Sequence, residues 1–227
     1  MGTRDRILEA ARRLFNDAGE ANVSASDIAA SVDLSPGNLH YHFPGKDRIH
    51  QALFDTFQRD MIMLMAPAVQ TPGLFQEQDQ DKEGAIETSW LFFTVVMEKI
   101  FSHRYLYDTT VQLIHQDPGV ARGMRRLLGL KQKACLVIAQ ELLSDQGSPR
   151  PPNLDRLAEA MCFSLTGWPA YSRLQYPGEN DTVLLHRGVL QVLAQCAPHL
   201  DGDRREFYLE CDNMYTQMVQ GPESTLD

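Results

Sequence analysis

The chain has 227 residues, enough for one large domain or for a small domain joined to a larger one, and its 43% hydrophobic and 22% charged residues are ordinary for a globular protein. Its formal net charge of −9 argues against indiscriminate binding to nucleic acid, because such binding depends on neutralising phosphates. No apolar run reaches the roughly 18 residues of a membrane-spanning helix, and charges interrupt the apolar positions of the N-terminus, so we expect a cytoplasmic protein with no membrane partner.

The sequence contains no motif of a common catalytic or metal site. Its four cysteines, Cys135, Cys162, Cys196 and Cys211, are widely separated and form no CxxC pair, so we interpret them as reduced core residues. There is no HExxH, no GxSxG, no phosphate-binding glycine loop and no Cys/His quartet at ligand spacing. We therefore expect no enzyme, no catalytic residues, no cofactor and no metal.

The negative charge lies mainly in the later part of the chain. Residues 1–59 contain seven Lys/Arg and eight Asp/Glu, a net charge of −1, which leaves −8 for the rest. No acid occurs from Leu34 to Lys46. Because acids would repel phosphates and the electronegative edges of bases, this acid-free window is a candidate surface for specific binding to DNA.

The first two predicted helices follow from apolar spacing and capping signals. Ile7, Ala11 and Phe15 recur at helical spacing, and Gly19 ends this first helix. The sequence SASD at residues 24–27 has the form of a capping box, in which the serine oxygen accepts from a backbone N–H and the acid reaches back. The box predicts a short second helix.

A turn at Asp33 separates this second helix from a third. Ser35 is expected to cap the third helix, which runs to about His42. A fourth helix is expected over residues 46–65, where an apolar stripe predicts a long buried face. Two short helices joined by a tight turn and supported by another helix form a helix-turn-helix module.

Residues 4–49 resemble the DNA-binding domain of the TetR (tetracycline repressor) family of bacterial regulators. The resemblance rests on ILEAARRLFNDAG and VSASDIAASVDLSPGNLHYHFPGKDRI, where capping, turn and apolar positions agree in order, and it covers about a fifth of the chain. Two positions depart from the family pattern. Asp33 stands where glycine is usual, and His40 stands where an aromatic residue is usual, which leaves the operator preference open.

The resemblance implies that this module contacts a double-stranded DNA operator. The implied contacts come from Ser24, Ser26, Ser35, Gly37, Asn38, His40, Tyr41 and Lys46. Asn38 can read an adenine edge, and His40 can read a guanine or bind a phosphate. Either His40 or His42 can instead be a packing residue. Lys46 has no obvious partner within the chain, which favours a DNA contact. The neighbouring Asp47 is also consistent with an ordinary solvent-exposed surface at this position.

The rest of the chain predicts a larger helical domain. A polar connector is expected over 66–84, a loop over 145–153, a frayed tail over 220–227, and helices over 85–102, 104–116, 119–144, 154–175, 180–196 and 203–219. We therefore expect an all-α fold. It has an N-terminal three-helix helix-turn-helix DNA-binding domain at residues 1–49, linked through helix 46–65, and a helical regulatory domain at residues 50–227.

The resemblance implies that the larger domain forms a homodimer and encloses a small-molecule pocket. The helix that begins at Asn153 is a candidate for the dimer interface, or it packs against its own core; its apolar stripe is Leu154, Leu157, Met161, Leu165, Trp168 and Tyr171. The following helix, through Leu185 and Val189, is its candidate partner, and Pro169 predicts a kink.

The candidate ligand-binding residues combine bulk with a polar handle. They are Trp90, Phe93, Met97, Tyr105, Tyr107, His115, Met161 and Trp168. Tyr107 and His115 are favoured because a buried hydroxyl or imidazole needs a partner that a ligand can supply. Residues of these types at helical spacing are also typical of a plain core.

The functional hypothesis is a ligand-responsive, DNA-binding transcriptional regulator. We expect a repressor that a small amphiphilic molecule of unknown identity releases from a palindromic operator. Two alternatives stay open at this point. One is a helical dimer that binds a small molecule or a partner protein without binding DNA, and the other is a metal-dependent enzyme.

Overall fold

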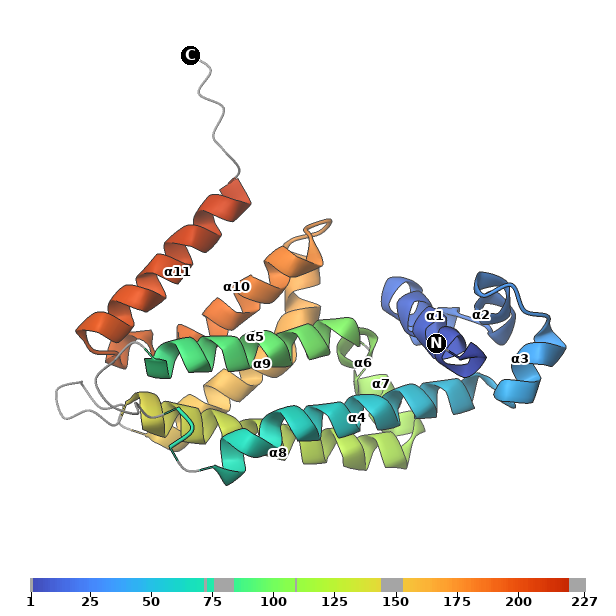
Figure 1. Cartoon of the computed structure of the whole chain (residues 1–227), viewed down its shortest axis with the longest axis horizontal. Coiled ribbons are helices and arrows are strands. Elements are labelled where there is room, and N and C mark those ends of the chain that lie inside the picture. Colours follow the sequence, from blue (N-terminus) through green and yellow to red (C-terminus); the bar gives the residue numbers. More distant parts are fainter. Residues whose placement is uncertain (1, 72, 76–83, 109, 144–152, 221–227) are drawn as a thin grey trace, which may run out of the picture. The chain divides into compact units, whose positions relative to one another are not determined.

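The computed structural model describes residues 2–71, 73–75, 84–108, 110–143 and 153–220, which are helical with short turns and contain no strand (Figure 1). The elements are α1 (Thr3–Ala18), η1 (Glu20–Asn22), α2 (Ala25–Ser31), α3 (Pro36–His42), α4 (Lys46–Gln70), α5 (Gly84–Ser102), α6 (Tyr105–Asp108), α7 (Thr110–Gln116), α8 (Pro118–Leu142), α9 (Leu154–Gln175), α10 (Asp181–Leu193), η2 (Ala197–His199) and α11 (Gly202–Gln220). The predicted all-α class is confirmed, and the predicted loop and tail lie almost wholly outside the described residues.

The chain divides into two compact units. Unit 1 comprises Met1–Met61 and Ser102–Arg125, and unit 2 comprises Ile62–Phe101 and Arg126–Asp227. The helices α4 and α8 each contribute one part to unit 1 and the other to unit 2. The grouping by contacts therefore differs from the predicted division by function at residue 49, which stays a proposal.

The core of unit 1 joins α1 to segments that are distant in the sequence. The ring of Phe15 lies 5.3 Å from that of Tyr105, and the ring of His50 packs edge-on against Tyr105 at 5.8 Å. Near the start of α8, a Cβ at Gly123 would lie 2.6 Å from Cζ of Phe54. This glycine lets α8 approach α4 more closely than any other residue would allow.

The local signals in the first 45 residues are confirmed. The Ser24 side chain accepts from the Asp27 N–H, and the Asp27 side chain accepts from the Ser24 N–H, which completes the capping box of α2. Asp33 adopts the left-handed φ of 57° that the turn requires. The Ser35 side chain accepts from the Asn38 N–H and so caps α3.

The fourth helix is longer than the sequence predicts. It continues past Met65 to Gln70 and contains Pro67, which lies in the predicted connector. A proline removes one backbone donor but leaves its own carbonyl available, and the Thr71 N–H donates to the Pro67 oxygen at 2.9 Å. Helical bonding therefore continues past the proline.

Unit 2 is built around α9, which packs against α10. The indole N–H of Trp168 donates to the Leu184 oxygen at 2.7 Å, and a Cβ at Gly188 would clash with the Trp168 ring and lie 2.8 Å from Cε of Met97. Met161 and Leu165 are also buried, whereas Tyr171 is exposed. The central part of the predicted stripe therefore packs within its own core, which was one of the two alternatives; the other was the dimer interface.

A buried lysine of unit 2 joins α8 to α9. Lys131 is buried and its Nζ donates to Thr166 Oγ1 at 3.0 Å, and burial lowers its pKa to about 8. All four cysteines are free and buried, which confirms their interpretation as core residues. Burial raises the pKa of Cys196 to about 12, so its thiol is unreactive near neutral pH.

Candidate nucleic-acid interface

The helix-turn-helix presents one face of α3 to solvent. Leu39 is buried below this helix, whereas Asn38, His40 and Tyr41 are exposed, and 85% of the Tyr41 side chain is accessible. Of the eight predicted DNA-contacting residues, seven are exposed: Ser24, Ser26, Ser35, Gly37, Asn38, His40 and Tyr41.

The two capping serines differ in what they can still offer. Ser24 Oγ lies 2.6 Å from Asp27 Oδ2 and donates its proton to that carboxylate, and this bond lowers the pKa of Asp27. Ser35 Oγ accepts from the Asn38 N–H at 3.2 Å, which uses only an acceptor position. A serine hydroxyl has one donor and two acceptor positions, so Ser35 is the better phosphate donor of the two.

Lys46 has a partner within the chain, and the expectation that it lacks one is wrong. Its Nζ lies 2.9 Å from the Glu20 backbone oxygen and 2.9 Å from Glu20 Oε1. The turn η1 after Gly19 carries Glu20 to the start of α4. Helical periodicity describes contacts within a helix, so it gave no sign of a pair whose members are 26 residues apart.

Two arginines that the sequence analysis did not single out lie at the ends of the motif helices. Arg4 Nη1 donates to the His42 oxygen at 3.2 Å, and its guanidinium lies 4.1 Å from the centre of the Phe43 ring. Arg6 Nη2 donates to the Val32 oxygen at 3.2 Å. A cation at a helix C-terminus is stabilising, and both residues are also exposed. The sequence feature that could have indicated these two residues is a pair of arginines close together near the start of the chain.

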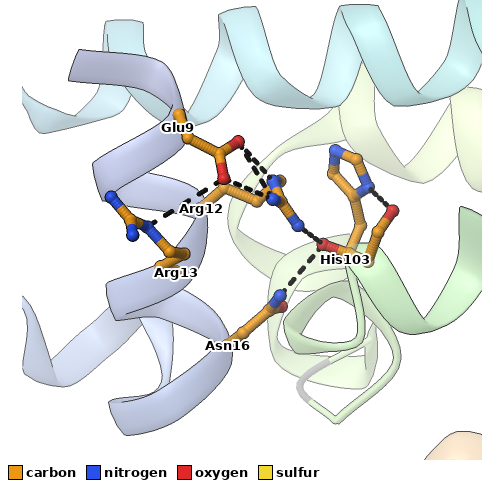
Figure 2. A network of polar contacts seen from close by, with 6 residues as sticks. Glu9, Arg12, Arg13, Asn16 and His103 are labelled. Carbon is orange, nitrogen blue, oxygen red and sulfur yellow. Dashed lines mark hydrogen bonds and ion pairs between the residues drawn. The ribbon is translucent and has the colours of Figure 1, made fainter. Parts of the chain in front are cut away.

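A polar network ties α1 to the end of α5 within unit 1 (Figure 2). Arg12 Nη1 and Asn16 Nδ2 both donate to the Ser102 oxygen, at 2.6 and 2.9 Å. Glu9 holds the Arg12 guanidinium with both carboxylate oxygens, at 2.7 and 2.9 Å to Nη2. Asn16 Oδ1 also accepts from the Tyr105 N–H at 3.2 Å. The network fixes α1 to the segment that follows α5.

The eight predicted ligand-binding residues are divided between the two units. Tyr105, Tyr107 and His115 belong to unit 1, and the other five belong to unit 2. His115 is exposed, so the argument from a buried imidazole does not apply to it. Tyr107 is buried with its ring 6.1 Å from that of Phe57. Trp90, Phe93, Met97 and Met161 do not line either of the two cavities described below.

Unit 2 contains two cavities, both partly open to solvent. The first, of about 310 Å³, is lined by Phe163, Ser164, Gly167, Trp168, Tyr171, Tyr176 and Gln191. The second, of about 240 Å³, is lined by Leu64, Leu74, Phe75, Thr88, Leu91, Phe92, Val95 and Val96. Trp168 alone among the predicted pocket residues contributes to either.

Other kinds of site find no support in the described part of the chain. Over the described residues, no group of three or more His, Cys, Asp or Glu side chains is arranged to hold a metal ion. None of the helices described is both long enough and apolar enough to cross a bilayer. An all-helical chain with a capped and exposed helix-turn-helix is typical of helix-turn-helix DNA-binding proteins.

Comparison with known proteins identifies the family. Residues 7–53 match the family described as bacterial regulatory proteins of the tetR family. Residues 72–208, more than half of the chain, match the TetR family described as bacterial transcriptional repressors. The chain therefore belongs to the TetR family, as its N-terminal sequence indicated.

Individual relatives resemble this chain over different lengths. The regulator UidR of Escherichia coli is 43% identical over 51 residues, which are 22% of this chain and 26% of that protein. TtgR of Pseudomonas putida is 39% identical over 54 residues, 24% of this chain and 26% of TtgR. The chain thus matches about a quarter of the length of these curated relatives. A TetR-family regulator from Marinobacter aquaeolei matches 95% of this chain and 99% of its own, with 27% identity and a TM-score of 0.73.

Proposed function

We propose that the chain is a ligand-responsive transcriptional repressor that binds a palindromic DNA operator as a homodimer and leaves it when a small amphiphilic molecule binds. The observation that carries this proposal is the exposed face of α3. It offers Asn38, His40 and Tyr41 to solvent with no acid on the helix, while Leu39 anchors it below. A recognition helix in the major groove needs this combination of polar reach and a fixed base.

The residues of the face suit different parts of a duplex. Asn38 has the amide that pairs with the adenine edge, and the Ser35 hydroxyl can donate to a phosphate. A Cβ at Gly37 would meet only Ser35 Oγ at 4.0 Å, so the absence of a side chain there is not required by the protein's own packing. Close approach of the DNA backbone is the reason we infer for this glycine.

Lys46 is a weaker candidate for a DNA contact than the sequence indicated. Its ammonium group is half-buried and already bound to Glu20. An ammonium group has three donors, so a phosphate contact would add to this pair. Arg4 and Arg6 are exposed cations at the ends of α3 and α2, and we include them among the groups that offset phosphate charge.

Dimerisation is required by the size of the motif, because one recognition helix buries too little surface for selective binding. Apolar side chains on α9 support this helix as part of the interface: Phe163 is 77% exposed and Leu174 is 85% exposed. Large exposed apolar groups commonly mark interaction surfaces. Two-fold symmetry would then present two α3 helices to successive major grooves about 34 Å apart.

Ligand release follows from a coupling free energy between effector and operator. A coupling of about 1–3 kcal/mol changes operator affinity roughly 5- to 150-fold. The α1 network, with Arg12 and Asn16 bound to the end of α5, is the contact through which we expect a shift of α5 to reach the helix-turn-helix. Action in the cytoplasm and the absence of catalytic activity belong to this proposal.

Selection of random duplexes by the purified full-length protein at physiological salt tests the function. We expect enrichment of a palindromic site. Asn38→Ala should relax one position in each half-site, with a loss of about 1–3 kcal/mol there, because a bidentate amide contact is removed. Glu98→Ala, an exposed position on α5, is the matched control and should select the same site. A folded dimer that enriches no site would contradict the proposal and favour a partner-binding or ligand-binding role.

A further inference from the structure

The helix α3 is too short to hold its position by itself. It has seven residues, Pro36–His42, and isolated helices shorter than about 12 residues are marginal in water even when their sequences favour helix. Leu39 within the helix and Phe43 directly after it are buried. The direction in which α3 presents its exposed side chains therefore depends on contacts that other elements make with its two ends.

The two ends of α3 differ in how their backbone groups are bonded. At the N-terminal end, Ser35 caps the helix by accepting from the Asn38 N–H at 3.2 Å. At the C-terminal end, Pro44 has no N–H, so it cannot donate to the His40 oxygen as the residue four positions on does in a continuing helix. The carbonyl groups of the last turn are therefore open to a donor from another element.

Arg4 of α1 supplies such a donor from 38 positions away. Its Nη1 donates to the His42 oxygen at 3.2 Å, and its guanidinium lies over the Phe43 ring, 4.1 Å from the ring centre. A planar guanidinium can stack through its face while it donates through its edge, which an ammonium group cannot do. One side chain thus holds the last residue of α3 and the buried residue that follows it.

A second arginine on α1 binds the end of the other helix of the motif. Arg6 Nη2 donates to the Val32 oxygen at 3.2 Å, at the residue that ends α2 and precedes the left-handed turn at Asp33. Two arginines spaced two positions apart on α1 therefore bond to the C-terminal ends of both motif helices. This arrangement indicates a brace for the helix-turn-helix rather than two independent surface contacts.

We propose that Arg4 is a positioning residue for operator recognition. By holding the His42 carbonyl and the Phe43 ring together, it sets the angle at which α3 presents Asn38 and Tyr41 to the bases. This role goes beyond the charge that Arg4 adds near the phosphates, because a lysine at this position would supply the same charge. The role in recognition rests on the proposed function, whereas the hold on α3 does not.

Hydrogen–deuterium exchange of the full-length protein without DNA tests the hold on α3. Arg4→Lys keeps the charge but loses the combined stacking and hydrogen bond, so the amides at the C-terminal end of α3 should exchange about threefold faster or more. The matched control is Arg13→Lys, at an exposed α1 residue that lies 3.9 Å from Glu9, and it should exchange like wild type. Equal exchange in Arg4→Lys and wild type would overturn the proposal, whether or not the protein binds DNA.

Binding to two duplexes tests the role in recognition. For the selected operator, Arg4→Lys should lose about threefold or more in affinity, whereas for an unrelated duplex of equal length it should match wild type because the charge is retained. Arg13→Lys should match wild type on both.

Two results would overturn the positioning role. Unchanged operator affinity in Arg4→Lys would leave the residue a merely structural part, and equal losses on both duplexes would indicate a phosphate contact by the guanidinium itself. A folded wild type that selects no operator would count against the proposed function, and the exchange measurement would still decide whether Arg4 holds α3.

Discussion

The helix-turn-helix and the α9–α10 region of unit 2 are both helical, yet they use their side chains in opposite ways. In α3 the polar residues Asn38 and His40 face solvent and a single buried leucine anchors the helix. In α9 the side chains of Met161 and Trp168 fill the space between helices, and Gly188 on α10 makes room for the indole. The first region is built to present groups to a partner, and the second is built to pack.

This difference predicts where a single methyl group matters most. Gly188→Ala puts a Cβ against the Trp168 ring and 2.8 Å from Cε of Met97, so α9 and α10 must separate. We expect a loss of about 1–3 kcal/mol in the free energy of unfolding, measured by urea denaturation. Gly129→Ala on α8 is the control, because nothing lies within 4 Å of its Cβ. That variant should be as stable as wild type or up to about 1 kcal/mol more stable.

The order of these two variants is the informative result. If Gly188→Ala were as stable as Gly129→Ala, the close packing of α10 against the Trp168 ring would be wrong. The comparison between a presenting region and a packing region would then lose its structural basis.

Lys46 combines features of both regions. Its side chain is bound to Glu20, and it also lies next to the recognition helix. We expect Lys46→Ala and Glu20→Ala each to lower the free energy of unfolding by up to about 1 kcal/mol, because each removes the half-buried ion pair. Lys46→Ala also removes the hydrogen bond to the Glu20 backbone oxygen, which Glu20→Ala leaves in place. Operator affinity, measured by fluorescence anisotropy, should fall for Lys46→Ala. An equal fall for Glu20→Ala would show that the lysine acts by positioning the loop rather than by contacting phosphate.

The smallest expected effect is a pH dependence that belongs to unit 1. Burial lowers the pKa of His50 below its ordinary value of 6.5, against the opposing effects of Glu20, Asp117 and Asp47. Below pH 6.5 the unfolded chain binds a proton that the native state resists, so the contribution of His50 is complete above pH 6.5 and is lost as the pH falls through the native pKa.

His50→Phe should flatten this acid dependence when unfolding by urea is followed between pH 7.5 and about pH 5. His186→Phe, at a half-buried position in unit 2, is the control and should keep the wild-type slope. A wild-type slope in His50→Phe would mean that another group is responsible.

What could be read from the sequence was local. The capping box of Ser24 and Asp27, the left-handed turn at Asp33 and the cap at Ser35 each involve residues within three positions of one another, and each is present. Several helix boundaries followed for the same reason, but three differ. The backbone of α4 continues through Pro67, the helix predicted over 104–116 is the two helices α6 and α7, and the helix predicted over 180–196 ends at Leu193. Short-range hydrogen bonds can be predicted from a single sequence because the spacing of the residues fixes the partners.

What could not be read depends on contacts between distant segments. Three contacts illustrate this. Lys46 pairs with Glu20, 26 positions away, and the ring of Phe15 packs against that of Tyr105, 90 positions away. The Phe75 N–H donates to the Glu141 carboxylate, 66 positions away. The criterion used for ligand-binding residues, a bulky side chain with a polar group, does not distinguish a core residue from one that lines a cavity. The second cavity is lined instead by aliphatic and phenyl groups, and Thr88 is the one lining residue with a polar side chain.

Operator binding by Gly37→Ala tests the central claim, that α3 is the surface that meets DNA, most directly. The added Cβ meets only Ser35 Oγ at 4.0 Å, and alanine is the better helix former, so the variant should be at least as stable as wild type. On the selected operator we expect its affinity to fall at least tenfold, because the methyl group stands between the helix and the phosphate backbone. Unchanged affinity in this stable variant would contradict the claim.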